Sequence, residues 1–134
     1  MTPEEIVASA RRCIGVRFRP QGRDPATGLD CVGVAGVAFD RTLPPARYPA
    51  RGRNWELLAT DAIEMGLREI VPGEARPGDL LIVEPGPGQI HTVVITPTGF
   101  VHADARLRRV VEAPGRPEWP VLAAWRGYNE TRLP

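Results

Sequence analysis

Three side chains of this sequence could together carry out nucleophilic catalysis: Cys31, His91 and His102. Cys31 follows Asp30 in the stretch Gly28–Gly36 (GLDCVGVAG), and Asp30 is predicted to cap a helix that begins at Cys31. The free N–H groups and the dipole of a helix N-terminus favour the thiolate form of a cysteine, which is the nucleophilic form. The pattern therefore predicts a reactive thiol at position 31, with a small buried core residue as the alternative.

The only two histidines, His91 and His102, both lie in predicted strands. A loop at Thr96–Gly99 would pair Ile95 with Phe100, and a tighter turn would place the two histidines directly opposite each other. Either register puts both imidazoles on one face of the sheet, within about 8 Å. A histidine beside a thiol accepts its proton, and a second polar group orients that histidine. The spacing alone, however, does not bring the thiol to this pair.

Zinc binding is a second use for the same three residues, because three protein ligands and a water form a typical catalytic zinc site. No fourth ligand is evident, and no pair has the short spacing of a CxxC or HExxH motif. We therefore expect neither a metal ion nor another cofactor.

The composition is that of one ordinary globular domain spanning residues 1–134, with 43% hydrophobic and 25% charged residues. Seventeen basic and 16 acidic residues give a net charge of +1, and aromatic residues are 6%. This composition argues against a nucleic-acid partner. No stretch approaches the roughly 20 apolar residues of a membrane span, and the N-terminus is unlike a secretory signal. We expect synthesis in the cytoplasm, no membrane partner, and two free thiols.

The N-terminal residues predict a helix that begins with a capping box. Thr2 can cap it, Pro3 suits its first turn, and Glu5 follows three residues after the cap. The residues expected to face the core are Ile6, Ala10, Cys13 and Ile14.

Two further helices are predicted after a loop at residues 17–30. Residues 31–40 are apolar on all sides, which is typical of a buried helix, although a buried strand fits the same pattern. A third helix is predicted from Asn54 to Gly66. The residues expected to face inward are Trp55, Leu58, Ala59, Ala62 and Ile63.

The second half of the chain has the pattern of strands. The five predicted strands are residues 79–84, 90–96, 99–104, 107–113 and 120–126. Helices first and strands later are typical of an α+β domain with an antiparallel sheet.

Beyond these patterns, the chain resembles the NlpC-type cell-wall cysteine peptidases. Four blocks carry the resemblance: GVRFRPQG (15–22), GLDCVG (28–33), RPGDLLIV (76–83) and IHTVVITPTGFVHA (90–103). The resemblance implies an α+β, papain-like fold with N-terminal helices packed on a central antiparallel sheet of about five strands. It also implies that Cys31 is the nucleophile, His91 the base and His102 the residue that orients the base, and it favours a helix after Cys31.

The same resemblance suggests that Asp30, Phe18 and Val32 contact substrate, and the charge of the loop before Cys31 adds Arg19 to these candidates. Asp30 could both cap the helix and face the substrate. Phe18 stands where the family often has a tyrosine, and Val32 replaces a common serine. Arg19 belongs to a basic loop that could meet carboxylates of a peptide, or could simply be solvated.

The function implied is a cysteine peptidase that hydrolyses peptidoglycan stem peptides, between the γ-carboxyl of D-glutamate and a diamino acid. The loop Phe18–Cys31 and the late Ala123–Arg126 (AAWR) most resemble the subgroup from phage tails and gene transfer agents. Tail proteins are therefore expected partners, with action at the cell wall inside such a particle. The alternatives are a catalytically inactive tail-assembly or wall-binding module, and an amidase or acyltransferase acting on another substrate.

Overall fold

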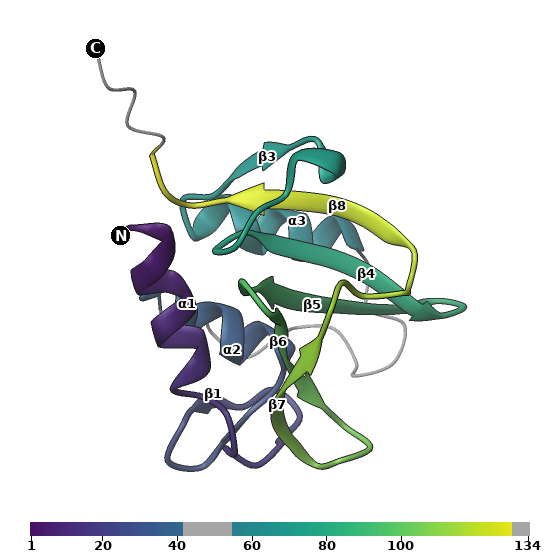
Figure 1. The fold of residues 1–134 in the computed structure, drawn as a ribbon. Helices are drawn as coiled ribbons and strands as arrows, with labels where there is room; N and C mark the ends of the chain where they lie inside the picture. Colours follow the sequence, from purple (N-terminus) through teal and green to yellow (C-terminus); the bar gives the residue numbers. More distant parts are fainter. Residues whose placement is uncertain (42–54, 130–134) are drawn as a thin grey trace.

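The computed structural model describes residues 1–41 and 55–129, and within these ranges the chain forms three helices and two antiparallel sheets (Figure 1). The helices are α1 (Pro3–Arg11), α2 (Cys31–Ala38) and α3 (Trp55–Glu64), with a 3-10 turn at Pro72–Glu74. The strands are β1 (Arg23–Asp24), β2 (Gly28–Leu29), β3 (Arg68–Ile70), β4 (Leu80–Gly86), β5 (Gln89–Ile95), β6 (Gly99–Asp104), β7 (Arg109–Pro114) and β8 (Val121–Arg126). The predicted α+β class is confirmed.

The main sheet has six strands in the order β3-β8-β4-β5-β6-β7, rather than about five. The additional strand, β3, pairs with β8 at the edge of the sheet. Residues 17–30 are also not entirely loop, because β1 and β2 form a small hairpin there. Strands of two or three residues are too short for an alternating pattern to identify them.

The capping box predicted for α1 is present. The backbone N–H of Glu5 donates to Thr2 Oγ1 (3.1 Å), and the backbone N–H of Thr2 donates to Glu5 Oε1 (2.9 Å). Ile6 and Ala10 are fully buried, as predicted. These contacts fix the beginning of the helix and the face that packs on the core.

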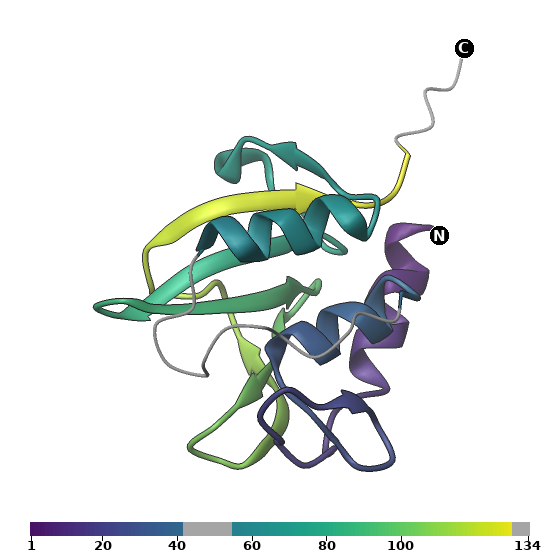
Figure 2. The same cartoon turned by 180° about the vertical axis from the view of Figure 1, so that it is seen from behind.

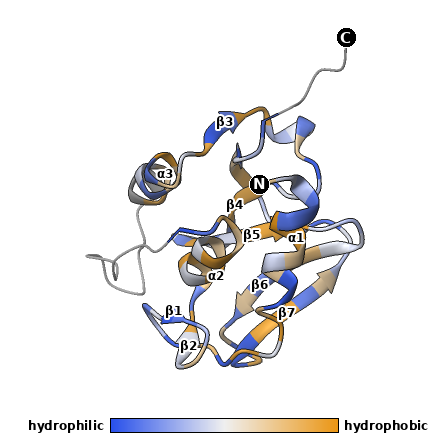
Figure 3. Ribbon diagram, turned by 90° about the vertical axis from the view of Figure 1, so that its left-hand side faces the viewer, coloured by the Kyte–Doolittle hydropathy of each residue, from blue (hydrophilic) through white to orange (hydrophobic). Residues whose placement is uncertain are grey.

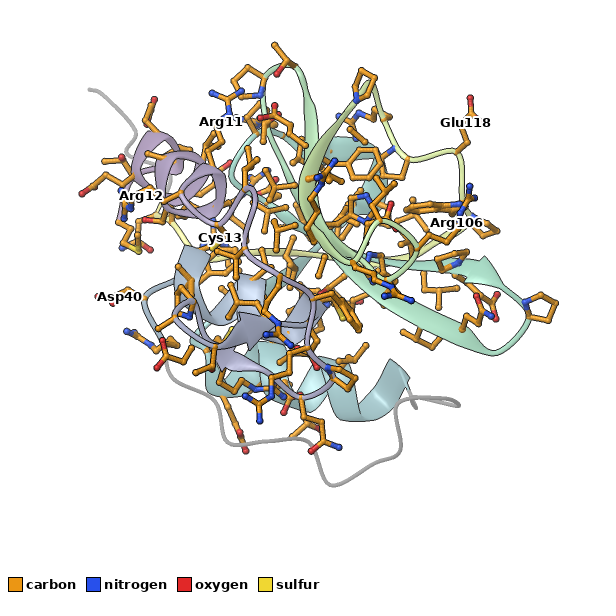
Figure 4. All side chains as sticks on the ribbon, turned by 90° about the horizontal axis from the view of Figure 1, so that it is seen from below. Arg11, Arg12, Cys13, Asp40, Arg106 and Glu118 are labelled. Atoms are coloured by element: carbon orange, nitrogen blue, oxygen red, sulfur yellow. The ribbon has the colours of Figure 1, made fainter. Side chains whose placement is uncertain are left out.

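The end of α1 corrects one prediction. The helix ends at Arg11, and Cys13 is still buried in the core (1% exposed) (Figure 4). Ile14, expected on the same face, is 44% exposed. Helical spacing predicts a common face only as far as the helix continues.

The segment after Cys31 is a helix, which excludes the strand alternative. Seven of the eight residues of α2 are buried, and its ribbon carries no strongly hydrophilic residue (Figure 3). The helix packs against α1, β5 and β6. A helix buried on all sides is apolar on all sides, as the sequence indicated.

The third helix, α3, lies across β4 and β8 (Figure 2). Leu58 and Ala62 are buried and Ala59 is half-buried, as predicted, but Ile63 is 63% exposed. Position 63 lies roughly 140° around the helix from position 58, and α3 buries only one face. The predicted cap Asn54 and the side chain of Trp55 lie outside the described residues. No helix in the described ranges is long and apolar enough to cross a membrane.

The sheet opens between β5 and β6, and this opening positions the site. Their ladder contains two residue pairs, Val94–Val101 and Ile95–Phe100, whereas β6 pairs with β7 along its whole length. The pair Ile95–Phe100 confirms the first of the two predicted registers. Helix α2 packs against both β5 and β6, and its first residue, Cys31, accepts a hydrogen bond from Thr92, which lies on β5 two residues beyond the last pair at Val94.

Candidate active site

Cys31 is the first residue of α2 and is almost completely buried (3% exposed). Asp30 caps the helix, because its Oδ1 accepts the backbone N–H of Gly33 (2.9 Å). The hydroxyl of Thr92 on β5 donates to the carbonyl oxygen of Cys31 (3.1 Å). Thr92 directly follows His91, so this hydrogen bond ties the start of α2 to the strand residue next to a histidine.

His91 and His102 are in direct contact. His91 Nε2 lies 2.9 Å from His102 Nδ1, and the ring centroids are 5.1 Å apart with the planes at 78°. One proton lies between the two nitrogens, so one ring donates and the other accepts. The two imidazoles therefore lie together on one face of the sheet, as predicted, and a hydrogen bond joins them.

The surroundings of His102 keep it neutral. Burial, and secondarily the charge of His91, lower the pKa of His102 to about 4, and the carboxylate of Asp104 only partly opposes this shift. At neutral pH His102 therefore carries one proton. When His91 is protonated on both nitrogens, Nδ1 of His102 can only accept, and it stabilises the imidazolium of His91.

The lowered pKa of His102 predicts a loss of stability in mild acid. An unfolded histidine titrates near pH 6.5, so between about pH 6.5 and 4 the unfolded chain binds more protons than the folded one. The stability from this group is complete above about pH 6.5 and falls by on the order of 2–3 kcal/mol toward pH 4. Urea unfolding at about pH 7 and 4.5 should show this decline in the wild type and a smaller one in His102→Gln. Equal losses of stability in the wild type and in His102→Gln would show that protonation of His102 does not cause the decline.

Trp119, in the segment before β8, covers the histidine pair. Its ring centroid lies 6.1 Å from that of His91 and 5.7 Å from that of His102, edge to face in both cases. Phe100 contacts the same indole at 5.8 Å. Sequence reasoning assigned no chemistry to Trp119, and no local motif marks it, because only the strand order brings residue 119 beside residues 91 and 102.

The four predicted substrate-binding residues lie in different environments. Asp30 is fully buried, and its carboxylate accepts hydrogen bonds from Gly33, from the backbone of Gln21 (3.0 Å) and from Arg23 (2.8 Å). Val32 is also buried (3% exposed). By contrast, Phe18 is half-buried and Arg19 is exposed. Their contact with substrate stays a prediction.

Within residues 1–41 and 55–129, no group of three or more His, Cys, Asp or Glu side chains is arranged to hold a metal ion. The described residues offer a buried thiol at the first position of α2 and a hydrogen-bonded imidazole pair on β5 and β6, and the contact between the thiol and His91 stays a prediction.

The sequence matches no family model and none of the curated proteins compared with it. Solved structures, however, have a similar fold. The structure is similar to the NlpC/p60 domain of the peptidoglycan hydrolase SagA, with a TM-score of 0.59, 23% identity, and coverage of 85% of this chain and 90% of that one.

Two further similar structures are larger proteins. The peptidoglycan hydrolase RipB from Mycobacterium tuberculosis has a TM-score of 0.63 and 21% identity, over 96% of this chain and 65% of RipB. NlpC1 from Trichomonas vaginalis has a TM-score of 0.71 and 14% identity, over 96% of this chain and 45% of NlpC1. The chain thus spans less than two thirds of each of these two relatives. Its fold is the fold of NlpC/p60 domains.

Proposed function

We propose that this protein is a cysteine peptidase of the NlpC/p60 type that hydrolyses amide bonds in peptidoglycan stem peptides. The observation that carries the proposal is the hydrogen bond between His91 on β5 and His102 on β6. The next residue of β5, Thr92, is hydrogen bonded to the backbone carbonyl of Cys31 at the start of α2. The similarity to NlpC/p60 domains, including those of two peptidoglycan hydrolases, supports the choice of substrate class.

The proposed reaction assigns one role to each side chain. The Cys31 thiolate attacks the amide carbonyl, and His91 gives its proton to the leaving amine as the C–N bond breaks. A water, losing a proton to His91, then attacks the thioester and releases the acid, and the thiolate is restored. Backbone N–H groups at the start of α2 stabilise the oxyanion in both steps.

The contact between the rings supports an assignment of roles to the ring nitrogens. Because His91 Nε2 faces His102 Nδ1, the His91 nitrogen that would exchange protons with the thiol and the leaving amine is Nδ1. Neutral His102 would hold the ring of His91 in this orientation, and Trp119 would limit the access of water to the pair.

The finer assignments rest on the sequence blocks. We propose a single domain over residues 1–134 that cleaves between D-glutamate and the diamino acid, within a phage-tail or gene-transfer-agent particle at the cell wall. The departures at Phe18 and Val32 keep an inactive tail or wall-binding module as the alternative.

A digest of purified peptidoglycan and soluble muropeptides, followed by mass spectrometry, tests the proposal. Wild type and Cys13→Ala should both release new stem-peptide fragments, whereas Cys31→Ala should release none. Cys13→Ala is the matched control, because Cys13 is the only other thiol and lies in the core. Fragments that persist in Cys31→Ala would exclude the proposed nucleophile, and their absence from all folded variants would favour the inactive module.

A further inference from the structure

The described residues include five exposed arginines at one end of the molecule, where the 17–19 segment meets the turn between β6 and β7. They are Arg17, Arg19, Arg106, Arg108 and Arg109, hereafter the arginine rim. Figure 4 places Arg106 on the side of the view opposite Arg11, the last residue of α1, and Arg12, which follows it. In a protein with a net charge of +1, this end therefore concentrates positive charge.

Backbone pairing between distant segments brings the rim together. Arg17 pairs with Arg109 in an antiparallel bridge, and the backbone N–H of Phe18 donates to the carbonyl of Arg108 (2.9 Å). Directly paired residues present their side chains on the same face, so Arg17 and Arg109 are neighbours. Two segments about 90 residues apart in sequence thus build one surface.

Gly28 leaves room for two of these arginines. A Cβ at this position would lie 2.6 Å from Cβ of Arg19 and 3.3 Å from Cγ of Arg17. Gly28 also has a φ of 134°, which few other residues adopt. The glycine that opens the Cys31 block therefore allows the stems of Arg17 and Arg19 to lie across β2.

The rim differs in its charge balance from three other arginines of the described residues. Arg11, Arg23 and Arg126 each pair with a carboxylate at 3.0 Å or less. None of the five rim guanidinium groups forms an ion pair within the described residues. Asp104, the carboxylate opposite Arg109, accepts the backbone N–H groups of Arg106 and Leu107 with Oδ1.

The rim adjoins the histidine pair. Asp104 pairs with Arg109, and the next pair on the same face of β6 and β7 is His102 with Val111. A two-residue step along a strand is about 7 Å. A charge carried by a substrate one or two residues from the reacting bond would therefore reach Arg109 and Arg17.

We propose that the arginine rim binds a carboxylate of the substrate, so that the enzyme selects stem peptides with free rather than amidated carboxyl groups. This inference rests on the proposed function. The planar guanidinium fork matches a carboxylate with two hydrogen bonds. The rim is compact and lies beside His102, which suits a group of the substrate better than a long anionic polymer.

Binding to peptidoglycan sacculi tests the rim without depending on hydrolysis. Cys31→Ala, which leaves the bound peptide intact, is mixed with sacculi that have free carboxyls and with the same sacculi after chemical amidation. We expect about tenfold weaker binding to the amidated sacculi, and a similar loss on free sacculi when Arg17→Gln and Arg109→Gln are added. Arg12→Gln is the matched control and should bind normally, because Arg12 is an exposed arginine directly after α1, on the other side of the molecule.

Three results would overturn the proposal: equal binding to both kinds of sacculi, an Arg12→Gln loss equal to that of the rim variant, or binding that disappears only when wall phosphodiester polymers are stripped. Urea unfolding of the Arg17→Gln, Arg109→Gln variant distinguishes a loss of binding from a loss of folding. Removing mutually repelling charges should leave its urea midpoint unchanged or higher. Carboxylate-dependent binding by a wild type that cleaves nothing would support the rim while contradicting the peptidase. Cleavage by a wild type whose binding does not depend on carboxylates would support the peptidase while contradicting the rim.

Discussion

Replacing His91 with glutamine is expected to slow the alkylation of Cys31 by iodoacetamide about 100-fold at mildly acidic pH. A cysteine thiol without a partner titrates near pH 8.5, so only about 0.3% is thiolate at about pH 6. A thiol paired with an imidazolium is mostly thiolate at the same pH, and the thiolate is the reacting species. Glutamine keeps a polar side chain at position 91 but cannot take the proton.

The same substitution should reduce peptide hydrolysis more than alkylation. His91 is proposed to act twice in each turnover, as acid toward the amine and as base toward water, so kcat/KM should fall by about 10⁴-fold or more. Matched rates of muropeptide cleavage by wild type and His91→Gln measure this loss. His102→Gln should fall less, because its glutamine can still accept the hydrogen bond from His91.

Cys13 provides an internal control for the alkylation experiment. Burial raises the pKa of Cys13 to about 11, so it should react slowly in every variant. Peptide mapping after alkylation separates the two thiols. If Cys31 of the wild type reacted as slowly as Cys13, or if His91→Gln left the rate at Cys31 unchanged, the thiolate–imidazolium pair would be excluded.

The second large effect concerns stability, and it arises at Arg126. Arg126 donates from Nε to Asp79 Oδ1 (3.0 Å) and from a terminal nitrogen to Oδ2 (2.8 Å), with side chains that are 4% and 0% exposed. Asp79 Oδ2 also accepts the backbone N–H of Arg76 (2.8 Å). Arg126→Met would leave this buried carboxylate without its counter-charge, which should lower the free energy of unfolding by about 3–5 kcal/mol.

Urea unfolding at neutral pH measures the loss, and two variants control it. Adding Asp79→Asn to Arg126→Met removes the orphaned charge and should recover much of the stability. Arg11→Met breaks a pair with Glu112 in which the arginine side chain is 39% exposed, and it should cost about 1 kcal/mol or less. Equal losses in Arg126→Met and Arg11→Met would show that burial of the pair is not decisive.

Local patterns predicted the elements whose causes lie within a few residues. The capping box of α1 needs only residues 2–5, and the Asp30 cap needs only residues 30–33. The hairpin that aligns Ile95 with Phe100 is set by its own short loop. Because the same short loop puts His91 and His102 on one face, the sequence alone predicted that the two imidazoles lie close together.

Predictions failed where distant segments decide the outcome. Ile14 and Ile63 are exposed because helix length and packing partners, rather than spacing, determine which faces are covered. The strand β3 exists because β8 offers an edge for three residues. Such short or terminal features have almost no periodicity of their own.

The sequence by itself determined the helix caps, the buried character of α2, the common face of the two histidines and the identity of the cysteine and histidines. Only the tertiary structure decided that the sheet opens between β5 and β6, that Thr92 ties the start of α2 to β5, and that Trp119 covers the histidines. It alone also joined Arg17 to Arg109. The physical reason is range: caps and turns are closed by neighbouring residues, whereas these contacts depend on the order of strands and on packing between segments far apart in the chain.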